Sequence, residues 1–122
     1  MKKRILLVED KKNVREAVVP ILEAKGFVVD QAANTREGLK KLEKERFDLV
    51  ISDTSMPPGK DGYELCRQIK QVRKLDVKVI IYTATFEIID PLKAKKSGAD
   101  DFIVKGTNPN ELFEAVDKVM KK

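Results

Sequence analysis

The sequence predicts a doubly wound α/β fold of the (βα)5 type, in which helices cover both faces of a parallel five-stranded sheet with strand order 2-1-3-4-5. Three observations predict it. Short apolar runs alternate strictly with amphipathic stretches along the 122 residues. The apolar runs are rich in β-branched residues and lack polar alternation, as strands buried on both faces do. Turn-forming residues separate the segments, and this alternation is typical of βα units.

The elements follow in order along the chain. The predicted strands are the apolar runs Ile5–Val8, Phe27–Val29, Leu49–Ile51, Val79–Tyr82 and Phe102–Val104. Between them, apolar residues recur at helical spacing and predict amphipathic helices. The predicted buried faces are Val14, Ala17, Val18, Ile21 and Leu22 in the first helix, Leu39 and Leu42 in the second, Leu65, Cys66, Ile69 and Val72 in the third, and Leu112, Phe113, Val116, Val119 and Met120 in the last.

Glycines and prolines mark the ends of these segments. Gly26 and Gly98 follow predicted helix ends, where a left-handed residue is common. Asn108-Pro109 supplies an N-cap and a first helical residue for the last helix, and Asp90-Pro91 does the same for a short fourth helix. Pro20 falls inside the first predicted helix and is expected to kink it.

Length and composition limit the classes of function. A chain of 122 residues, 42% of them hydrophobic, suits one domain with a single core, so residues 1–122 are expected to form one domain. No apolar run approaches the roughly 18 to 20 residues of a membrane span, and acids follow the first apolar run, so we expect a cytoplasmic protein without a signal peptide. The single Cys66 excludes an internal disulfide, and the absence of histidine excludes His-based triads and His metal ligands.

The net charge of +5 and the pI of about 9.3 raise nucleic acid as a partner. The Lys and Arg residues, however, fall into several separate segments of the sequence, and most alternate with acids at helical spacing. Solvated helix faces explain that pattern, and only two Tyr and five Phe are available for base stacking. We therefore expect neither nucleic-acid nor membrane binding by this domain.

Charged and polar residues stand at the ends of four predicted strands. Glu9 and Asp10 end the first strand, Asp53 the third, Thr83 the fourth and Lys105 the fifth. In a parallel α/β sheet the ligand site lies outside the carboxyl ends of the strands, here at the switch point between strands 1 and 3. A lone Asp53 would be an ordinary turn residue, but this convergence predicts a functional site.

The chemistry of such a cluster follows from its groups. Three carboxylates held together repel, so they bind protons or recruit a cation. All-oxygen ligation favours a hard ion, and Mg²⁺ suits it because Mg²⁺ keeps water and phosphate oxygens as its other ligands. Asp53 can then act as the nucleophile toward a phosphoryl group, with Lys105 as a second positive charge and Thr83 as a hydroxyl donor.

Five segments carry a resemblance to a known family: ILLVED at 5–10, DLVISD at 48–53, MPPGKDG at 56–62, IIYTA at 80–84 and GADDFIVK at 98–105. Together they resemble the receiver domain of two-component response regulators, which has a flavodoxin-like fold, over essentially the whole chain. The resemblance implies that Asp53 accepts a phosphoryl group from a sensor histidine kinase or histidine phosphotransfer protein, and that Lys105 contacts that group. It also implies four ligands for Mg²⁺: Glu9, Asp10, Asp53 and the backbone carbonyl of Ser55.

A conformational switch is implied as well. Thr83 would move toward the phosphate and Phe102 would turn inward, reshaping the surface of helix 4, strand 5 and helix 5 for an output protein or a fused output domain. Phe102 has a second interpretation as a core residue, and partial exposure would favour the switch. A phosphorylation-dependent homodimer through the same surface is a further expectation.

Two departures from the family pattern limit the resemblance. The family usually has a proline after the lysine, with a cis peptide bond, whereas this chain has Gly106. A cis bond without proline costs about 2.5–4 kcal/mol, so we expect a trans Lys105–Gly106 bond or a strained loop. The segment 56–62 is one residue longer than usual, which a surface loop tolerates, so the metal site should survive while kinase docking nearby changes.

Three alternatives stay open. A degenerate receiver would bind partners without phosphorylation, although the acidic residues, Thr83 and Lys105 argue against it. An aspartyl-phosphate-type phosphatase needs a second Asp two positions after the nucleophile, where this chain has Ser55. A flavodoxin-like redox module is disfavoured because the acids of EDKKN at 9–13 would repel a cofactor phosphate.

Overall fold

The computed structural model describes residues 2–53, 62–83, 92, 96–105 and 110–121, and its order of elements is that of a (βα)5 protein. One parallel sheet has the order β2-β1-β3-β4-β5, which confirms the predicted fold class and strand order. Its strands are β1 (Arg4–Val8), β2 (Val28–Ala32), β3 (Leu49–Ser52), β4 (Lys78–Thr83) and β5 (Asp101–Val104). The helices are α1 (Lys12–Ala24), α2 (Thr35–Lys44), α3 (Gly62–Arg67) with a π-helical turn η1 (Gln68–Val72), and α5 (Asn110–Met120).

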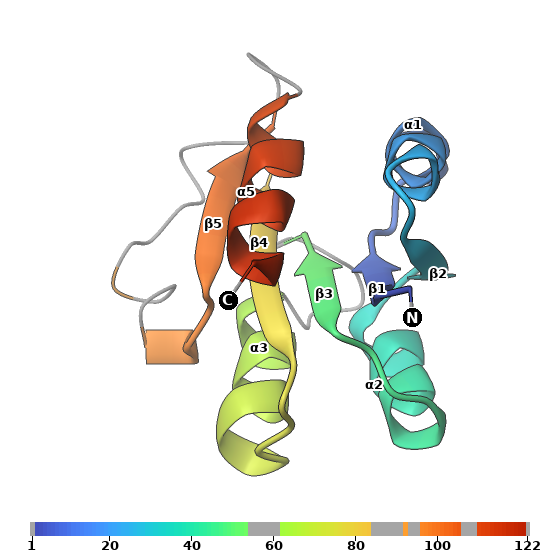
Figure 1. Ribbon diagram of the computed structural model, residues 1–122. Helices are drawn as coiled ribbons and strands as arrows, with labels where there is room; N and C mark the ends of the chain where they lie inside the picture. Colours follow the sequence, from blue (N-terminus) through green and yellow to red (C-terminus); the bar gives the residue numbers. More distant parts are fainter. Residues whose placement is uncertain (1, 54–61, 84–91, 93–95, 106–109, 122) are drawn as a thin grey trace.

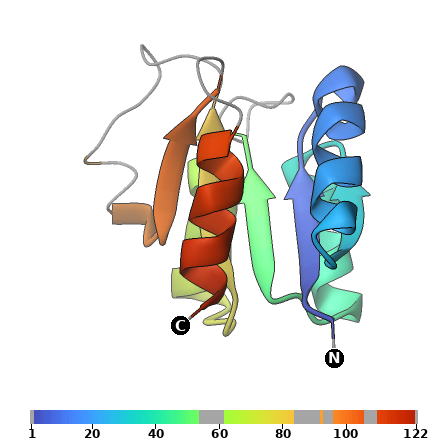
Figure 2. The ribbon, with the colours of Figure 1, turned by 45° about the horizontal axis from the view of Figure 1, so that its top comes forward.

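Two layers of helices enclose the sheet, and the core is accordingly divided in two (Figures 1 and 2). Helices α1 and α5 cover one face, where they pack on alternate residues of the central strands: Ile5, Leu7, Leu49, Ile51 and Ile80. Helices α2 and α3 cover the other face, which presents the intervening residues Leu6, Val8, Val50, Val79 and Ile81. Since both faces of β1, β3 and β4 are buried, these strands need the uninterrupted apolar composition from which they were predicted.

The prediction was wrong at the edges of the sheet. Strand β2 continues to Ala32 rather than ending at Val29, and Val28 is 43% exposed. β5 is the other edge strand, and its residues are half-buried or exposed. Each edge strand has a neighbouring strand on one side only, so polar residues such as Gln31 are tolerated there, and an apolar run no longer marks the full length of the strand.

The helices differ from their predicted faces in similar ways. Ala17 and Ile21 of α1 and Val72 of η1 are exposed, because the sheet covers a narrower stripe of each helix than the apolar pattern suggested. Helix α1 continues through Pro20, which lies on its exposed side. The predicted caps at Asp90-Pro91 and Asn108-Pro109 lie outside the described residues. Among those residues, no helix has the length and apolar character to cross a membrane.

Gly26 and Gly98 have the left-handed conformation predicted for them, with φ of 101° and 87°. A Cβ atom at Gly98 would lie 3.3 Å from Cβ of Lys70, whereas one at Gly26 would meet nothing within 4 Å. We expect Gly26→Ala to cost about 1–2 kcal/mol of unfolding free energy through backbone strain alone, and Gly98→Ala to cost more. Urea unfolding of the two variants measures the difference, and equal losses would show that Lys70 yields without cost.

Candidate functional site

The ends of β1 and β3 bring the three predicted carboxylates together. These strands are neighbours, with Val8 opposite Ser52, so the residues that follow them lie level with each other. The N–H of Asp53 donates to the carbonyl oxygen of Val8 at 3.1 Å. One carboxylate oxygen from each of Glu9, Asp10 and Asp53 lies within 4.8 Å of the other two. Sequence reasoning therefore placed this cluster correctly.

Lys105 supplies a positive charge to the cluster from two strands away. Its N–H donates to the carbonyl oxygen of Thr83 at 2.6 Å, which holds the residue after β5 against the end of β4. Its Nζ lies 2.5 Å from Oε1 of Glu9 and 3.3 Å from Oδ2 of Asp53, and the three side chains are 11%, 1% and 2% exposed. One ammonium thus bridges two buried carboxylates.

Burial sets the electrostatics of Glu9. Desolvation raises the pKa of its carboxyl group, the hydrogen bond from Lys105 lowers it, and the charge of Asp53 raises it again, so that the pKa lies above its ordinary value. The backbone N–H of Lys11 also donates to Oε2 of Glu9 at 3.2 Å. Glu9 therefore takes up a proton more readily than an exposed glutamate does.

Asp10 provides independent evidence that the cluster suits a cation. Its Oδ1 is buried and has no hydrogen-bond partner among the described residues. A buried carboxylate oxygen is costly without a partner. Three carboxylates against one ammonium also leave a net negative charge when all are ionised. The donor set consists of oxygens alone, so the residues fit a hard divalent ion such as Mg²⁺.

Of the other residues predicted for the site and its switch, the structure describes Thr83 and Phe102. Thr83 is the last residue of β4 and is 1% exposed. Phe102 lies in the edge strand β5 and is 40% exposed, so its interpretation as a core residue was wrong. Ser55 and Gly106 lie outside the described residues, as does most of the longer loop at 56–62.

Two side chains at the site carried no signal in the sequence. Nη1 of Arg15, from α1, donates to the carbonyl oxygen of Glu9 at 2.6 Å and so fixes the backbone at the end of β1. The ring of Tyr82 lies 5.1 Å from Nζ of Lys105, within the range of a cation–π contact. Burial and then the charge of Glu9 raise the pKa of Tyr82. Neither residue follows a predicted apolar run, which was the criterion that identified the others.

Comparisons with known proteins agree with this geometry. A family model described as the response regulator receiver domain matches residues 5–117. The chain is 34% identical over its whole length to the alkaline phosphatase synthesis transcriptional regulatory protein PhoP of Bacillus subtilis, and 36% identical over 97% of its length to the transcriptional regulatory protein AfsQ1 of Streptomyces coelicolor. It covers 50% and 51% of these two proteins, so it spans about half the length of the curated relatives it matches.

Solved structures show the same similarity. The response regulator protein TrrA of Thermotoga maritima, in complex with Mg²⁺-BeF, has a TM-score of 0.85 and 39% identity, with 96% of this chain and 98% of that chain covered. The chemotaxis protein CheY4 of Vibrio cholerae has a TM-score of 0.87 and 29% identity, with coverages of 98% and 99%.

Proposed function

Since the chain belongs to the response regulator receiver domain family, we propose that it is a phosphorylation-dependent signalling switch whose phosphoryl acceptor is Asp53. Receiver domains are signalling switches and not metabolic enzymes. The observation that carries the proposal is the meeting of Glu9, Asp10, Asp53 and Lys105 in one buried cluster at the carboxyl ends of the strands. The complex of the relative TrrA with Mg²⁺-BeF supports the same site chemistry.

Phosphoryl transfer needs an ionised nucleophile and compensation for the charge of the incoming group. An oxygen of Asp53 attacks phosphorus, the bond from phosphorus to the donor nitrogen or acyl oxygen breaks, and the donor keeps the electron pair. Lys105 already lies 3.3 Å from Asp53, close enough to contact a phosphoryl oxygen there. Bound Mg²⁺, held by Glu9, Asp10, Asp53 and the carbonyl of Ser55, would supply Lewis-acid neutralisation of the transferring oxygens.

Two residues, Thr83 and Phe102, would pass the effect of phosphorylation on to the protein surface. Thr83, at the end of β4, would donate its hydroxyl to a phosphoryl oxygen. Phe102 stands 40% exposed and would turn inward. The altered surface of helix 4, β5 and α5 would be recognised by an output protein, a fused output domain or a second copy. The expected donor is a sensor histidine kinase or a histidine phosphotransfer protein.

The direct test uses a small acyl-phosphate donor. Incubation of the protein with acetyl phosphate and Mg²⁺ should add one phosphoryl group by intact mass, and an excess of EDTA should prevent it. The product should be labile to hydroxylamine, as an acyl phosphate is, and peptide mapping should place it at Asp53. A folded protein that binds Mg²⁺ but takes up no phosphoryl group would instead be a degenerate receiver that binds its partners without phosphorylation.

Asp10→Asn should weaken Mg²⁺ binding by at least about tenfold, because it removes one anionic ligand while the side-chain volume stays the same. The metal-free variant should be as stable as the wild type or more so, since one of three repelling charges is gone. Isothermal titration with Mg²⁺ and urea unfolding in EDTA measure the two effects. Unchanged Mg²⁺ affinity would exclude Asp10 from the ligand set, and Asp76→Asn, at the opposite end of the molecule, is the matched control.

A further inference from the structure

Among the described residues, the excess of positive charge lies at one end of the molecule. The strands are parallel and the helices run back against them, so each described strand begins and each described helix ends at the same end, where both chain termini lie (Figure 2). This basic end comprises the strand entries and the last helical turns: residues 2–4, 21–28, 41–49, 69–78, 96–101 and 117–121. It holds 14 Lys and Arg against 8 Asp and Glu, a net charge of +6. The other described residues hold 7 Lys and Arg against 9 Asp and Glu, a net charge of −2.

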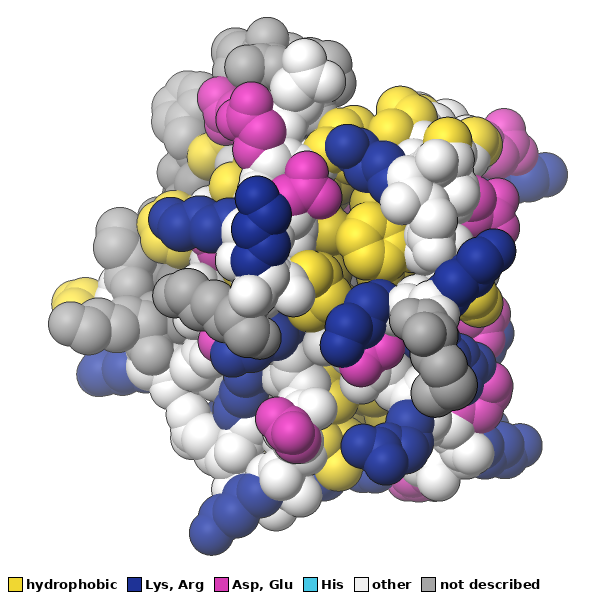
Figure 3. Space-filling model, viewed as in Figure 1, with side chains coloured by type: hydrophobic (Ala, Val, Ile, Leu, Met, Phe, Trp, Pro, Cys, Tyr) yellow, Lys and Arg dark blue, Asp and Glu magenta, His cyan; other side chains and the backbone are white. Residues whose placement is uncertain are grey.

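The fold thus gathers cations that are dispersed along the sequence. Their dispersal was the reason to expect no nucleic-acid binding, and the three-dimensional arrangement removes that reason. In Figure 3, Lys and Arg side chains project at the lower margin of the molecule, where α2 and α3 end in Figure 1, and others lie across the middle of this face. A cluster of like charges on one end produces a field that a chain of alternating charges does not.

Four of the eight acids at this end form ion pairs with neighbouring cations. Ion pairs join Glu43 with Arg73, Glu45 with Arg4, Asp100 with Lys70 and Asp117 with Lys25. Exposed cations at this end have no described carboxylate within ion-pair distance; they are Lys2, Lys3, Lys44, Arg46, Lys74, Lys96 and Lys121. These side chains remain available to an external anion.

Helix dipoles explain only part of this arrangement. A cation in the last turn of a helix contributes about 0.3–1 kcal/mol, which accounts for residues such as Lys44. Lys2, Lys3 and Arg46 lead into strands and gain nothing from a dipole. Lys74 even has a left-handed backbone with φ of 51°, a conformation that a glycine would adopt without strain.

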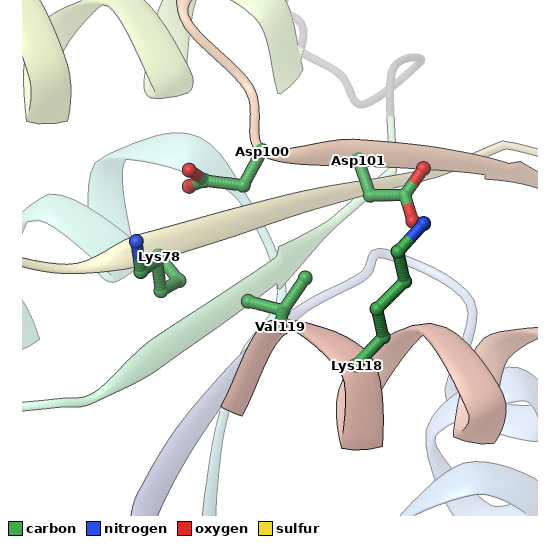
Figure 4. Close-up of a pocket in the computed structure, with 5 residues that line it drawn as sticks. All are labelled: Lys78, Asp100, Asp101, Lys118 and Val119. Carbon is green, nitrogen blue, oxygen red and sulfur yellow. The ribbon is translucent and has the colours of Figure 1, made fainter. Parts of the chain in front are cut away.

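A cavity of about 200 Å³ lies within the basic end, between β4, β5 and α5 (Figure 4). Lys78 and Lys118 approach it from opposite sides, and Asp100 and Asp101 line it as well. Asp100 accepts a hydrogen bond from the N–H of Val79 at 2.8 Å and pairs with Lys70 at 2.8 Å. Because two lysines and two aspartates line the cavity, it does not favour binding of a single anion inside. The positively charged surface around the cavity is the better candidate for anion binding.

We propose that the basic end binds the phosphate backbone of nucleic acid without sequence preference. Ammonium groups on six separate segments form a broad surface, which suits repeated phosphates more than one small anion. The exposed large apolar side chains there, Ile21, Val28 and Val72, are aliphatic and stand on separate elements, so they do not form the aromatic and aliphatic face of a membrane-surface helix. The acidic cluster at the opposite end would face away from the nucleic acid and stay accessible to its donor.

The test compares two triple variants of equal charge. Lys44→Gln, Lys74→Gln and Lys121→Gln remove three unpaired cations of the basic end, while Lys12→Gln, Arg36→Gln and Lys40→Gln remove three cations elsewhere. The probe is a fluorescein-labelled DNA duplex of about 20 base pairs, followed by anisotropy between about 50 and 200 mM salt. The wild type should bind with a Kd of order 10⁻⁴ to 10⁻⁶ M at physiological salt, more tightly at lower salt.

The basic-end variant should bind at least about tenfold more weakly at low salt, with a shallower dependence of log K on log salt, and the control variant should keep most of its affinity. Phosphoryl uptake from acetyl phosphate should be unchanged in both, which shows that the variants are folded independently of DNA binding. The proposal is overturned if the wild type does not bind DNA at low salt, if both variants lose affinity equally, or if the wild type binds vesicles containing phosphatidylserine but not DNA.

Discussion

Replacing Asp53 by Asn is expected to abolish phosphoryl uptake while leaving the domain folded. The amide oxygen of Asn is a poor nucleophile toward phosphorus. Neither backbone contact of residue 53 depends on the charge, because its N–H donates to Val8 and its carbonyl oxygen accepts from Oγ of Ser52 at 3.0 Å. Intact mass after incubation with acetyl phosphate and Mg²⁺ measures the effect.

The same variant should also change stability in a direction that a merely disruptive mutation would not. Asp53→Asn removes one of three repelling carboxylates and leaves Lys105 paired with Glu9 at 2.5 Å. In EDTA its urea midpoint should therefore equal or exceed that of the wild type. A large loss of stability would mean that Asp53 is a structural ion-pair partner above all, and phosphoryl uptake by the folded variant would place the acceptor elsewhere. Asp76→Asn, far from the site, serves as the control.

The sequence predicted the centre of the fold better than its edges, for a physical reason. Strands β1, β3 and β4 are buried on both faces, so every position must be apolar and the pattern is continuous. The edge strand β2 carries a charged residue, Asp30. Burial raises the pKa of its carboxyl group, but the hydrogen bonds from Lys41 and Gln31 and the charge of Lys41 lower the pKa by more, so the net shift is downward. A strand that includes such a residue gives no apolar run to recognise.

The site could be predicted because it depends on topology more than on side-chain detail. Once the strand order is known, residues that follow the strands meet at one rim, so Glu9, Asp53 and Lys105 could be placed from the sequence alone. The contact of Arg15 with the Glu9 carbonyl could not, because it depends on where α1 starts relative to β1. The gathering of cations at the opposite end was missed for a related reason: their positions were compared along the sequence rather than across the fold.

Lys105→Gln should slow phosphoryl uptake by about 10²- to 10³-fold, the range found when one charged or hydrogen-bonding group that stabilises a transition state is removed. The variant keeps Asp53, Glu9 and Asp10, so Mg²⁺ binding should be as strong as in the wild type or stronger, since an ammonium that competes for the same oxygens is absent. The rate of mass increase with acetyl phosphate at saturating Mg²⁺ measures the first effect, and calorimetric titration the second. A rate within about threefold of the wild type would show that Lys105 has only a structural role.

Stability provides the second readout for this variant. Removing one partner of a buried ion pair costs roughly 3–5 kcal/mol, but Glu9 can reduce that cost by taking up a proton. The hydrogen bond and charge of Lys105 both lower the pKa of Glu9, so in the variant this pKa rises further above its ordinary value. A carboxyl group whose pKa is higher in the folded than in the unfolded state makes the fold more stable as pH falls through that range.

The stability deficit of Lys105→Gln relative to the wild type should therefore be largest at neutral pH and shrink as pH is lowered, because Glu9 takes up a proton more readily in the folded variant. Urea unfolding in EDTA at a series of pH values from neutral downward tests the prediction. Mg²⁺ should abolish most of the deficit at neutral pH, because the ion supplies the positive charge that the ammonium supplied before. Lys12→Gln, which removes an exposed cation of α1, should show neither dependence. A deficit that is independent of both pH and Mg²⁺ would indicate that Lys105 contributes packing rather than charge.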